Sequence, residues 1–307
     1  MSASTPYERE FLLNLETIPS VKPKARQSRL DSLAWSAGLS FTAYGVRIGL
    51  RSNRAAALED IVARLPLGWK ASSSPVVDTV YSILCNEAVS ADGESAFYLY
   101  KDNHQLFQCA SREGFLDRLE SDLALHVAEN TQRRVFVHAG VVGWGSHAIL
   151  IPGRSFSGKT TLVAALIRAG AAYYSDEFAV LDDRGMVHPY PRPLQVRETG
   201  APHQTRRRAD EFGAMVGRVP LPVGLVLLSR YKAGAKWRPR HLSAGQAMLG
   251  ILDNTVSARR GPAAALKTLK EVVGGSFAVK GIRGEGHEVV DWISTYFHPQ
   301  KMFATGE

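Results

Sequence analysis

The sequence predicts an α/β protein, and three observations support this. Short apolar segments rich in β-branched residues alternate with stretches in which apolar residues recur every three or four positions. One glycine-rich turn, at residues 153–161, joins an apolar strand pattern to an apolar helix pattern. The composition, 45% hydrophobic and 21% charged among 307 residues, is that of a globular chain with room for one large domain or two ordinary ones.

Residues 1–130 are predicted to form the smaller, N-terminal α+β domain. Up to about residue 30, prolines and basic residues interrupt any periodic pattern. Alternating patterns then predict strands, and a repeat of three and four residues from Phe115 to Val127 predicts an amphipathic helix. The expected elements are strand 41–50, helix 54–65, strand 76–84, a hairpin at 97–109 turning at Asp102-Asn103, and helix 112–130.

The pattern changes near residue 134, and residues 131–307 are predicted to form the second domain. Long apolar strands appear here, separated by helices and turns. The expected elements are strands 135–142 and 147–152, helix 161–168 capped at Gly170, a hairpin at 178–187, strand 223–228, and helices 243–252 and 262–273.

The charge of the chain restricts its partners. There are 37 basic and 29 acidic side chains, a net charge of +8, which favours anionic ligands. The densest basic run, residues 206–208, is followed by Asp210 and Glu211 and has no interleaved aromatic residues on which bases could stack. No nucleic-acid partner is therefore expected.

The cysteines and the apolar segments indicate a compartment. Cys85 and Cys109 are the only cysteines, and neither stands in a metal-binding spacing. Two thiols in such a chain are typical of a reducing environment. The start lacks the pattern of a signal peptide, and no stretch reaches the length of a membrane span. A cytoplasmic location is expected.

The strongest functional signal is a segment that matches the phosphate-binding pattern G-x-x-x-x-G-K-[ST] at every position. Its residues are Gly153, Arg154, Ser155, Phe156, Ser157, Gly158, Lys159, Thr160 and Thr161. The glycines let backbone N–H groups approach a phosphate at the start of a helix. Lys159 offers a charge to the β- and γ-phosphates, and Thr160 a hydroxyl to Mg²⁺. The segment predicts binding of ATP or another nucleoside triphosphate.

Phosphoryl transfer to a hydroxyl also needs carboxylates, one for the metal and one to accept the proton of the acceptor. Asp176 and Glu177 follow the loop helix after one short connection, and a doubly wound sheet would place them at a strand end beside the loop. His138 is a further candidate, although a histidine in an apolar strand is more often a core residue. The proline-rich segment 189–197 could hold Arg192 or Arg197 toward the γ-phosphate, or be a rigid connector.

Together these residues resemble the catalytic domain of the HPr kinase/phosphorylase family, and more closely its shorter HPr kinase-related members, over residues 134–200. The resemblance rests on three short segments around the loop, which are His138-Ala139-Gly140, Arg168-Ala169-Gly170 and Ser175-Asp176-Glu177. It implies a nucleotide-binding core of that type, also shared with phosphoenolpyruvate carboxykinase. It further implies that Asp176 is the base toward a serine hydroxyl and that His138 stands near it. The position of the adjacent carboxylates, not the resemblance, assigns Glu177 to the metal with Thr160 of the loop.

The sequence departs from this family at one metal-linked position. The family has Glu-Ile-Arg-Gly downstream, whereas this chain has Gln195-Val196-Arg197-Glu198, which keeps the arginine and replaces the first glutamate. Glu198 could substitute for it. The family's C-terminal loop for the reverse, phosphorylase reaction has no clear match, and residues 1–130 do not resemble the N-terminal domain of the bifunctional enzyme.

The sequence thus predicts an ATP- and Mg²⁺-dependent kinase with Asp176, His138 and Arg197 as catalytic residues. The expected acceptor is a serine of a protein or peptide, because some relatives act in pathways for modified peptides, or a small hydroxylated metabolite. Two alternatives are a nucleotide-binding regulatory module without turnover, favoured by Gln195, and an NTP hydrolase. The acceptor, the choice between ATP and GTP, and a homo-oligomeric state stay open.

Overall fold

The structure is a computed structural model that describes residues 30, 33–74, 76–86, 96–154, 157–197 and 204–297. The described residues divide into two compact units. The first unit comprises the described residues up to Phe41, together with Arg47–Leu65 and Lys70–Glu120. The second unit comprises Thr42–Val46, Pro66–Trp69 and the described residues from Ser121 onward. The predicted boundary at residue 130 stays a prediction.

A six-stranded sheet forms the basis of the first unit. In sheet order its strands are β3 (Lys70–Ala71), β1 (Ala37–Ala43), β2 (Val46–Ser52), β4 (Thr79–Asn86), β5 (Ala96–Lys101) and β6 (His104–Cys109). The helices are α3 (Ala55–Val62) and α4 (Arg112–Asn130), whose residues up to Glu120 belong to this unit. The predicted helices and the β5–β6 hairpin are confirmed, and Phe115, Leu116 and Leu119 of α4 are buried as expected.

The predicted single strand at residues 41–50 is wrong. Tyr44 and Gly45 adopt positive φ angles of 49° and 88°, and the chain reverses there between β1 and β2. Positive φ at both central residues is the geometry of a tight hairpin turn, and glycine adopts it without steric cost. The alternation of apolar residues continues through the turn, and this hides the reversal from sequence reading.

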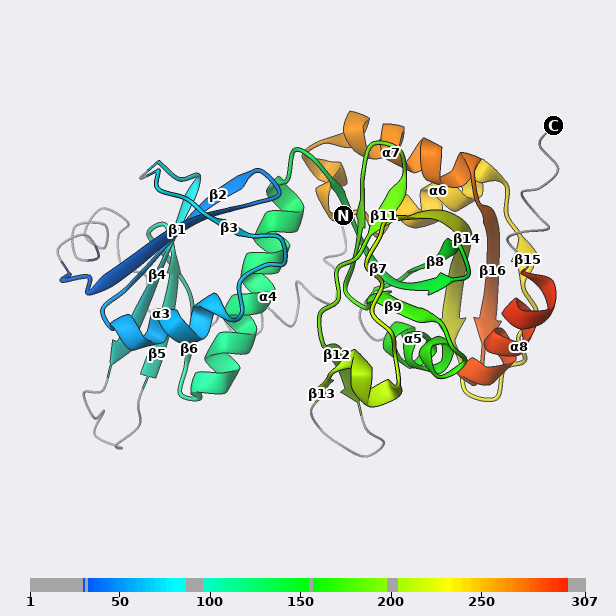
Figure 1. The fold of residues 1–307 in the computed structure, drawn as a ribbon, viewed down its shortest axis with the longest axis horizontal. Coiled ribbons are helices and arrows are strands. Elements are labelled where there is room, and N and C mark those ends of the chain that lie inside the picture. Colours follow the sequence, from blue (N-terminus) through cyan, green and yellow to red (C-terminus); the bar gives the residue numbers. More distant parts are fainter. Residues whose placement is uncertain are drawn as a thin grey trace, which may run out of the picture. The chain divides into compact units, whose positions relative to one another are not determined.

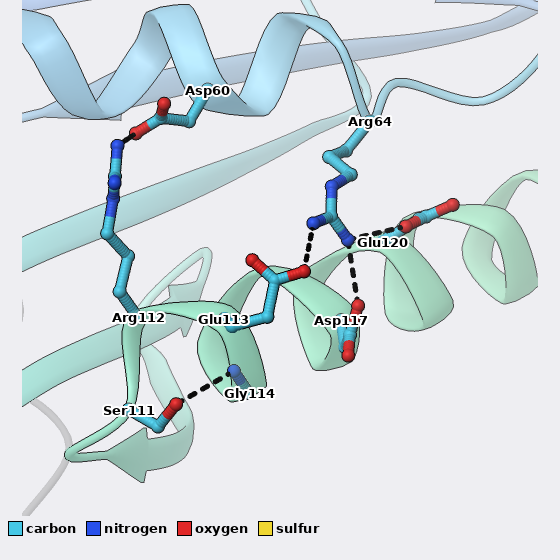
Figure 2. A network of polar contacts seen from close by, with 8 residues as sticks. All are labelled: Asp60, Arg64, Ser111, Arg112, Glu113, Gly114, Asp117 and Glu120. Atoms are coloured by element: carbon cyan, nitrogen blue, oxygen red, sulfur yellow. Dashed lines mark hydrogen bonds and ion pairs between the residues drawn. The ribbon is translucent and has the colours of Figure 1, made fainter. Parts of the chain in front are cut away.

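Arg64 links the end of α3 to one side of α4 (Figure 2). Its guanidinium is paired with Glu113, Asp117 and Glu120, three acids that recur along α4. Nearby, Arg112 at the start of α4 pairs with Asp60 of α3. Because Arg64 is half-buried and Arg112 is exposed, the first pairing is expected to contribute more to stability.

The second unit is built on an eight-stranded mixed sheet. In order its strands are β11 (Met186–His188), β10 (Phe178–Leu181), β7 (Val135–Trp144), β8 (His147–Pro152), β14 (Leu221–Tyr231), β16 (Phe277–Arg283) and β15 (Arg240–His241), with β9 (Ala172–Ser175) paired to β7. A separate hairpin is formed by β12 (Leu194–Arg197) and β13 (Gln204–Arg207). The strands and the β10–β11 hairpin expected from the sequence are confirmed, whereas β9, β12, β13, β15 and β16 were not anticipated.

Helices cover both faces of this sheet (Figure 1). On one face α5 (Lys159–Arg168) and α8 (Gly286–Tyr296) pack over a core that includes Ile149, Leu225 and Val279. On the other, α6 (Ala244–Leu252) and α7 (Pro262–Gly274) pack over Leu150, Val226 and Ala278. Short 3₁₀ turns occupy Ala209–Phe212 and Val256–Arg259. The unit is therefore α/β, as the sequence predicts.

Three strands of this sheet set the position of the loop. β8 and β16 both run parallel to β14, which lies between them, so the carboxyl ends of the three strands lie at one edge. Ligands of open α/β sheets bind at such an edge. β7, by contrast, is antiparallel to β8, so the sheet is mixed rather than doubly wound. No helix in the described part of the chain is both long and apolar enough to cross a membrane.

Candidate functional site

The geometry of the loop requires a glycine at position 158. Gly158 has a left-handed φ of +82°, and a Cβ on it would lie 2.6 Å from Nη2 of Arg283. A Cβ on Gly153 would lie 2.7 Å from Oγ of Ser157. The left-handed φ and the buried Arg283 leave no room for a side chain at Gly158, whereas a Cβ at Gly153 would require the Ser157 hydroxyl to move. Arg154 is exposed, and Ser155 and Phe156 lie outside the described residues.

Lys159 opens α5 and is buried within the site. Its Nζ donates to the carbonyl oxygen of Gly153 at 3.2 Å and lies 3.3 Å from Nε2 of His138. Burial lowers the pKa of Lys159, while the charges of Asp176 and Glu177 act in the opposite direction. Gly140 of β7 makes room for the lysine, since a Cβ there would lie 3.1 Å from its Cγ and still closer to Val163.

Asp176 lies beside the first turn of α5. Its Oδ2 accepts a hydrogen bond of 2.6 Å from Oγ1 of Thr160. Its Oδ1 is buried and has no hydrogen-bond partner among the described residues. Burial raises the pKa of Asp176 to about 6, assisted by Glu177 and opposed by Lys159 and the Thr160 hydroxyl. The sequence placed this carboxylate next to the loop, and the structure brings the two together.

Glu177 points to a different partner. Its carboxylate is paired with the guanidinium of Arg192, from the proline-rich segment. The backbone oxygen of Arg192 accepts a hydrogen bond of 2.5 Å from the hydroxyl of Tyr173, which fixes the segment against β9. Arg192 thus reaches the acidic pair. The described residues contain no cluster of three or more His, Cys, Asp or Glu side chains that could hold a metal.

His138 lies opposite Phe178 across the β7–β10 pair, and its backbone ties together separate parts of the site. Its N–H donates to the carbonyl of Asn254 at 2.7 Å, and its carbonyl accepts from the N–H of Gly153 at 3.2 Å. Burial and the charge of Lys159 lower the pKa of His138 to about 3. The ring is therefore neutral at neutral pH, and its Nε2 can accept a hydrogen bond from the lysine ammonium.

Two other predicted residues, Thr161 and Arg197, are placed by their secondary-structure elements. Thr161 is exposed on the first turn of α5. Arg197 is the last residue of β12, and its backbone pairs with Gln204 of β13. The catalytic and metal-binding roles assigned to Arg197, His138 and Glu177 stay predictions, as does that of Asp176.

Sequence reasoning missed Arg283, which is 1% exposed at the end of β16. Its Nη2 donates to the carbonyl of Gly158 at 2.5 Å, and its Nη1 donates to the carbonyl of Gly284 at 3.0 Å. Burial lowers the pKa of its guanidinium, although an arginine stays charged at neutral pH. No local pattern identifies this residue, because only the parallel pairing of β14 with β16 and β8 brings it to the loop.

The donors and acceptors of the site fit a nucleoside triphosphate with Mg²⁺. The first N–H groups of a helix have no intrahelical acceptor and favour an anion. Mg²⁺ takes only one or two carboxylates from a protein and completes its shell with phosphate oxygens and water. The Thr160 hydroxyl is an oxygen of the kind that it requires, and the adjacent Asp176 and Glu177 leave one carboxylate for the metal and one for a proton.

Comparison with known proteins adds little to this geometry. No family model matches the chain, and no curated protein matches it. Among solved structures it is similar to an Hpr(Ser) kinase/phosphatase from Coxiella burnetii, with 14% identity over 54% of this chain and 97% of that one, at a TM-score of 0.30. A TM-score this low establishes no common fold, so the roles of the residues are inferred from their own geometry.

Proposed function

We propose that this protein binds ATP and Mg²⁺ at the loop of residues 153–161 and transfers the γ-phosphate to a hydroxyl group. The observation that carries the proposal is the position of Asp176, hydrogen-bonded to Thr160 through one oxygen and unpartnered and buried at the other. A carboxylate in that place, at the start of the loop helix, can accept a proton or bind a metal.

Each residue of the site has a task in this reaction. The loop backbone and Lys159 hold the β- and γ-phosphates. Asp176 orients the acceptor hydroxyl and accepts its proton, for which a pKa of about 6 is well suited because it is close to the working pH. Thr160 and Glu177 are the expected partners of Mg²⁺, which when bound would offset negative charge on the phosphates.

The surrounding side chains keep these groups in place. Neutral His138 accepts a hydrogen bond from the Lys159 ammonium and so holds the ammonium beside the loop. Arg192 holds Glu177, and can follow the carboxylate or turn toward the transferred phosphate when the metal binds. We infer a protein or peptide serine as the acceptor, with a small hydroxylated metabolite as the alternative, on the family resemblance alone.

The test is a time course with γ-labelled ATP and a panel of serine peptides and hydroxylated metabolites. ADP, free phosphate and phospho-acceptor are measured together. A kinase yields ADP and phospho-acceptor in equal amounts, with slow hydrolysis, because a site that aligns a hydroxyl holds water poorly. Free phosphate matching ADP with every acceptor would instead identify a hydrolase, and tight ATP binding without ADP would identify a regulatory module.

Asp176→Asn is the decisive variant in this assay. It keeps the shape of the side chain and removes the proton acceptor, so turnover should fall roughly 100-fold or more while ATP still binds. The control is Asp183→Asn, which removes an exposed carboxylate a few residues away. Wild-type turnover by Asp176→Asn would contradict the assignment of the base, and lost ATP binding would make Asp176 a metal ligand.

A further inference from the structure

Arg283 is placed directly behind the phosphate loop. β14 and β16 run parallel, and Tyr231 and Arg283 lie side by side at their carboxyl ends. From there the guanidinium reaches the carbonyl of Gly158, the residue that precedes Lys159. Its Nε is buried and has no hydrogen-bond partner in the described part of the chain. The side chain therefore contributes a charge to the interior of the site.

This charge has no carboxylate at ion-pair distance among the described residues, and the exposed Glu285 acts on the guanidinium only through its longer-range field. The contacts of the guanidinium are two backbone carbonyls and the ring of Tyr231, whose centroid is 5.6 Å away. Removing a cation from water is costly unless an anion compensates it. A buried cation beside a loop suited to phosphates indicates that the compensating anion is the ligand.

The contact with Gly158 also fixes the shape of the loop. The carbonyl of Gly158 accepts the N–H of Leu162 at 3.2 Å and the Nη2 of Arg283 at 2.5 Å, so two donors hold it on the protein side. With this carbonyl fixed, the following N–H groups of α5, which lack intrahelical acceptors, remain available to a phosphate. Asp176 Oδ1, buried and unpartnered, is a second group in the site that lacks a partner among the described residues.

We propose that Arg283 is a positioning residue of the phosphate site, which sets the loop through the Gly158 carbonyl and whose charge is balanced by the bound polyphosphate. This inference rests on the nucleotide binding proposed above. In this proposal Arg283 acts through the Gly158 carbonyl and through the electrostatic field of its guanidinium, and makes no contact with the acceptor.

The test compares Arg283→Met with Arg230→Met, which removes an exposed arginine next to Tyr231 on β14. Binding of ADP and of inorganic pyrophosphate is measured by calorimetry, and the stability of the unliganded protein by thermal denaturation. Arg283→Met should bind both ligands roughly tenfold or more weakly. Its melting midpoint should be unchanged or higher, since a buried charge without an ion-pair partner is gone. Arg230→Met should bind as the wild type does.

The variant Arg283→Lys keeps the charge and should recover most of the affinity that methionine loses. Wild-type affinity in Arg283→Met, with a lower melting midpoint, would show that Arg283 only packs, and the inference would be wrong. If the methionine variant does not fold, Arg283→Gln, which keeps a donor for the Gly158 carbonyl, decides the question in the same way. A wild-type protein that binds neither ligand would instead overturn the proposed function.

Discussion

Lys159 and His138 meet inside the site, with 3.3 Å between Nζ and Nε2. Lys159 begins the helix α5, which follows the strand β8 in sequence, and His138 lies on β7, which precedes β8 and pairs antiparallel with it. The histidine is neutral, because burial and the lysine charge hold its pKa at about 3. The contact is therefore a hydrogen bond to a cation rather than a repulsion, and it keeps the ammonium close to the loop until a phosphate replaces the weaker partners.

Lys159→Met should lose most triphosphate binding. The loop would lose its point charge toward the β- and γ-phosphates, a charge-assisted contact worth on the order of 2 kcal/mol, or about 30-fold in affinity. Titration with a fluorescent ATP analogue measures the loss. The control is Lys267→Met on α7, where an equal charge is removed from an exposed position. Equal affinity of the two variants would exclude Lys159 from the phosphate site.

Gly158→Ala should disturb both the fold and the site. An alanine at φ +82° is strained by about 1–2 kcal/mol, and its Cβ would lie 2.6 Å from Arg283. The free energy of unfolding should fall by at least that amount, and phosphate binding should weaken as the loop shifts. Gly245→Ala on α6, with no atom within 4 Å of the added Cβ, should be neutral or slightly stabilising. Urea denaturation of both variants provides the comparison.

In the first unit, Arg64→Met should destabilise more than Arg112→Met (Figure 2). The Arg64 side chain is 20% exposed and serves three acids, whereas that of Arg112 is 63% exposed and serves one. Loss of the first is expected to cost about 1–3 kcal/mol, because Glu120 is buried, and loss of the second about 0–1 kcal/mol. Urea denaturation, monitored by a signal that reports on the first unit, tests which of the two variants is less stable. A larger effect at Arg112 would contradict it.

Local signals in the sequence predict much of the fold. The helix α4 has the predicted bounds, and α6 begins after Ser243, whose hydroxyl caps it by accepting from the N–H of Gln246. These features depend on residues a few positions apart, so their chemistry can be read directly from the chain. The loop, Lys159 and the position of Asp176 beside Thr160 follow in the same way from one strand, one helix and one short connection.

Features that depend on distant pairing were missed. Arg283 is 125 residues from Gly158 in sequence, and nothing in its neighbourhood distinguishes it from a solvated arginine. The partner of Glu177 is likewise unforeseen, since the sequence leaves open whether Arg192 or Arg197 faces the γ-phosphate or whether the segment is only a connector. In both cases the sequence identifies the residue type, while the register between strands decides which groups meet.

The last prediction concerns the pH dependence of stability and the charge of Asp176. Burial raises its pKa from 3.8 to about 6, so the folded state prefers the protonated acid. Its stabilising contribution is complete below about pH 4 and is lost as the pH rises through 6. Two pK units at 1.36 kcal/mol each correspond to about 3 kcal/mol. Asp176→Asn, which imitates the neutral acid, should therefore raise the free energy of unfolding at pH 8 by about that amount, and by little at pH 4.

The pKa of His138 is shifted in the opposite direction, but His138 is present in both proteins, so its contribution cancels in the difference between them. Urea denaturation of the unliganded proteins at pH 4, 6 and 8 measures the effect, with Asp183→Asn as the exposed control. If the difference in unfolding free energy between Asp176→Asn and the wild type did not change with pH, the pKa of Asp176 would not be raised in the folded protein.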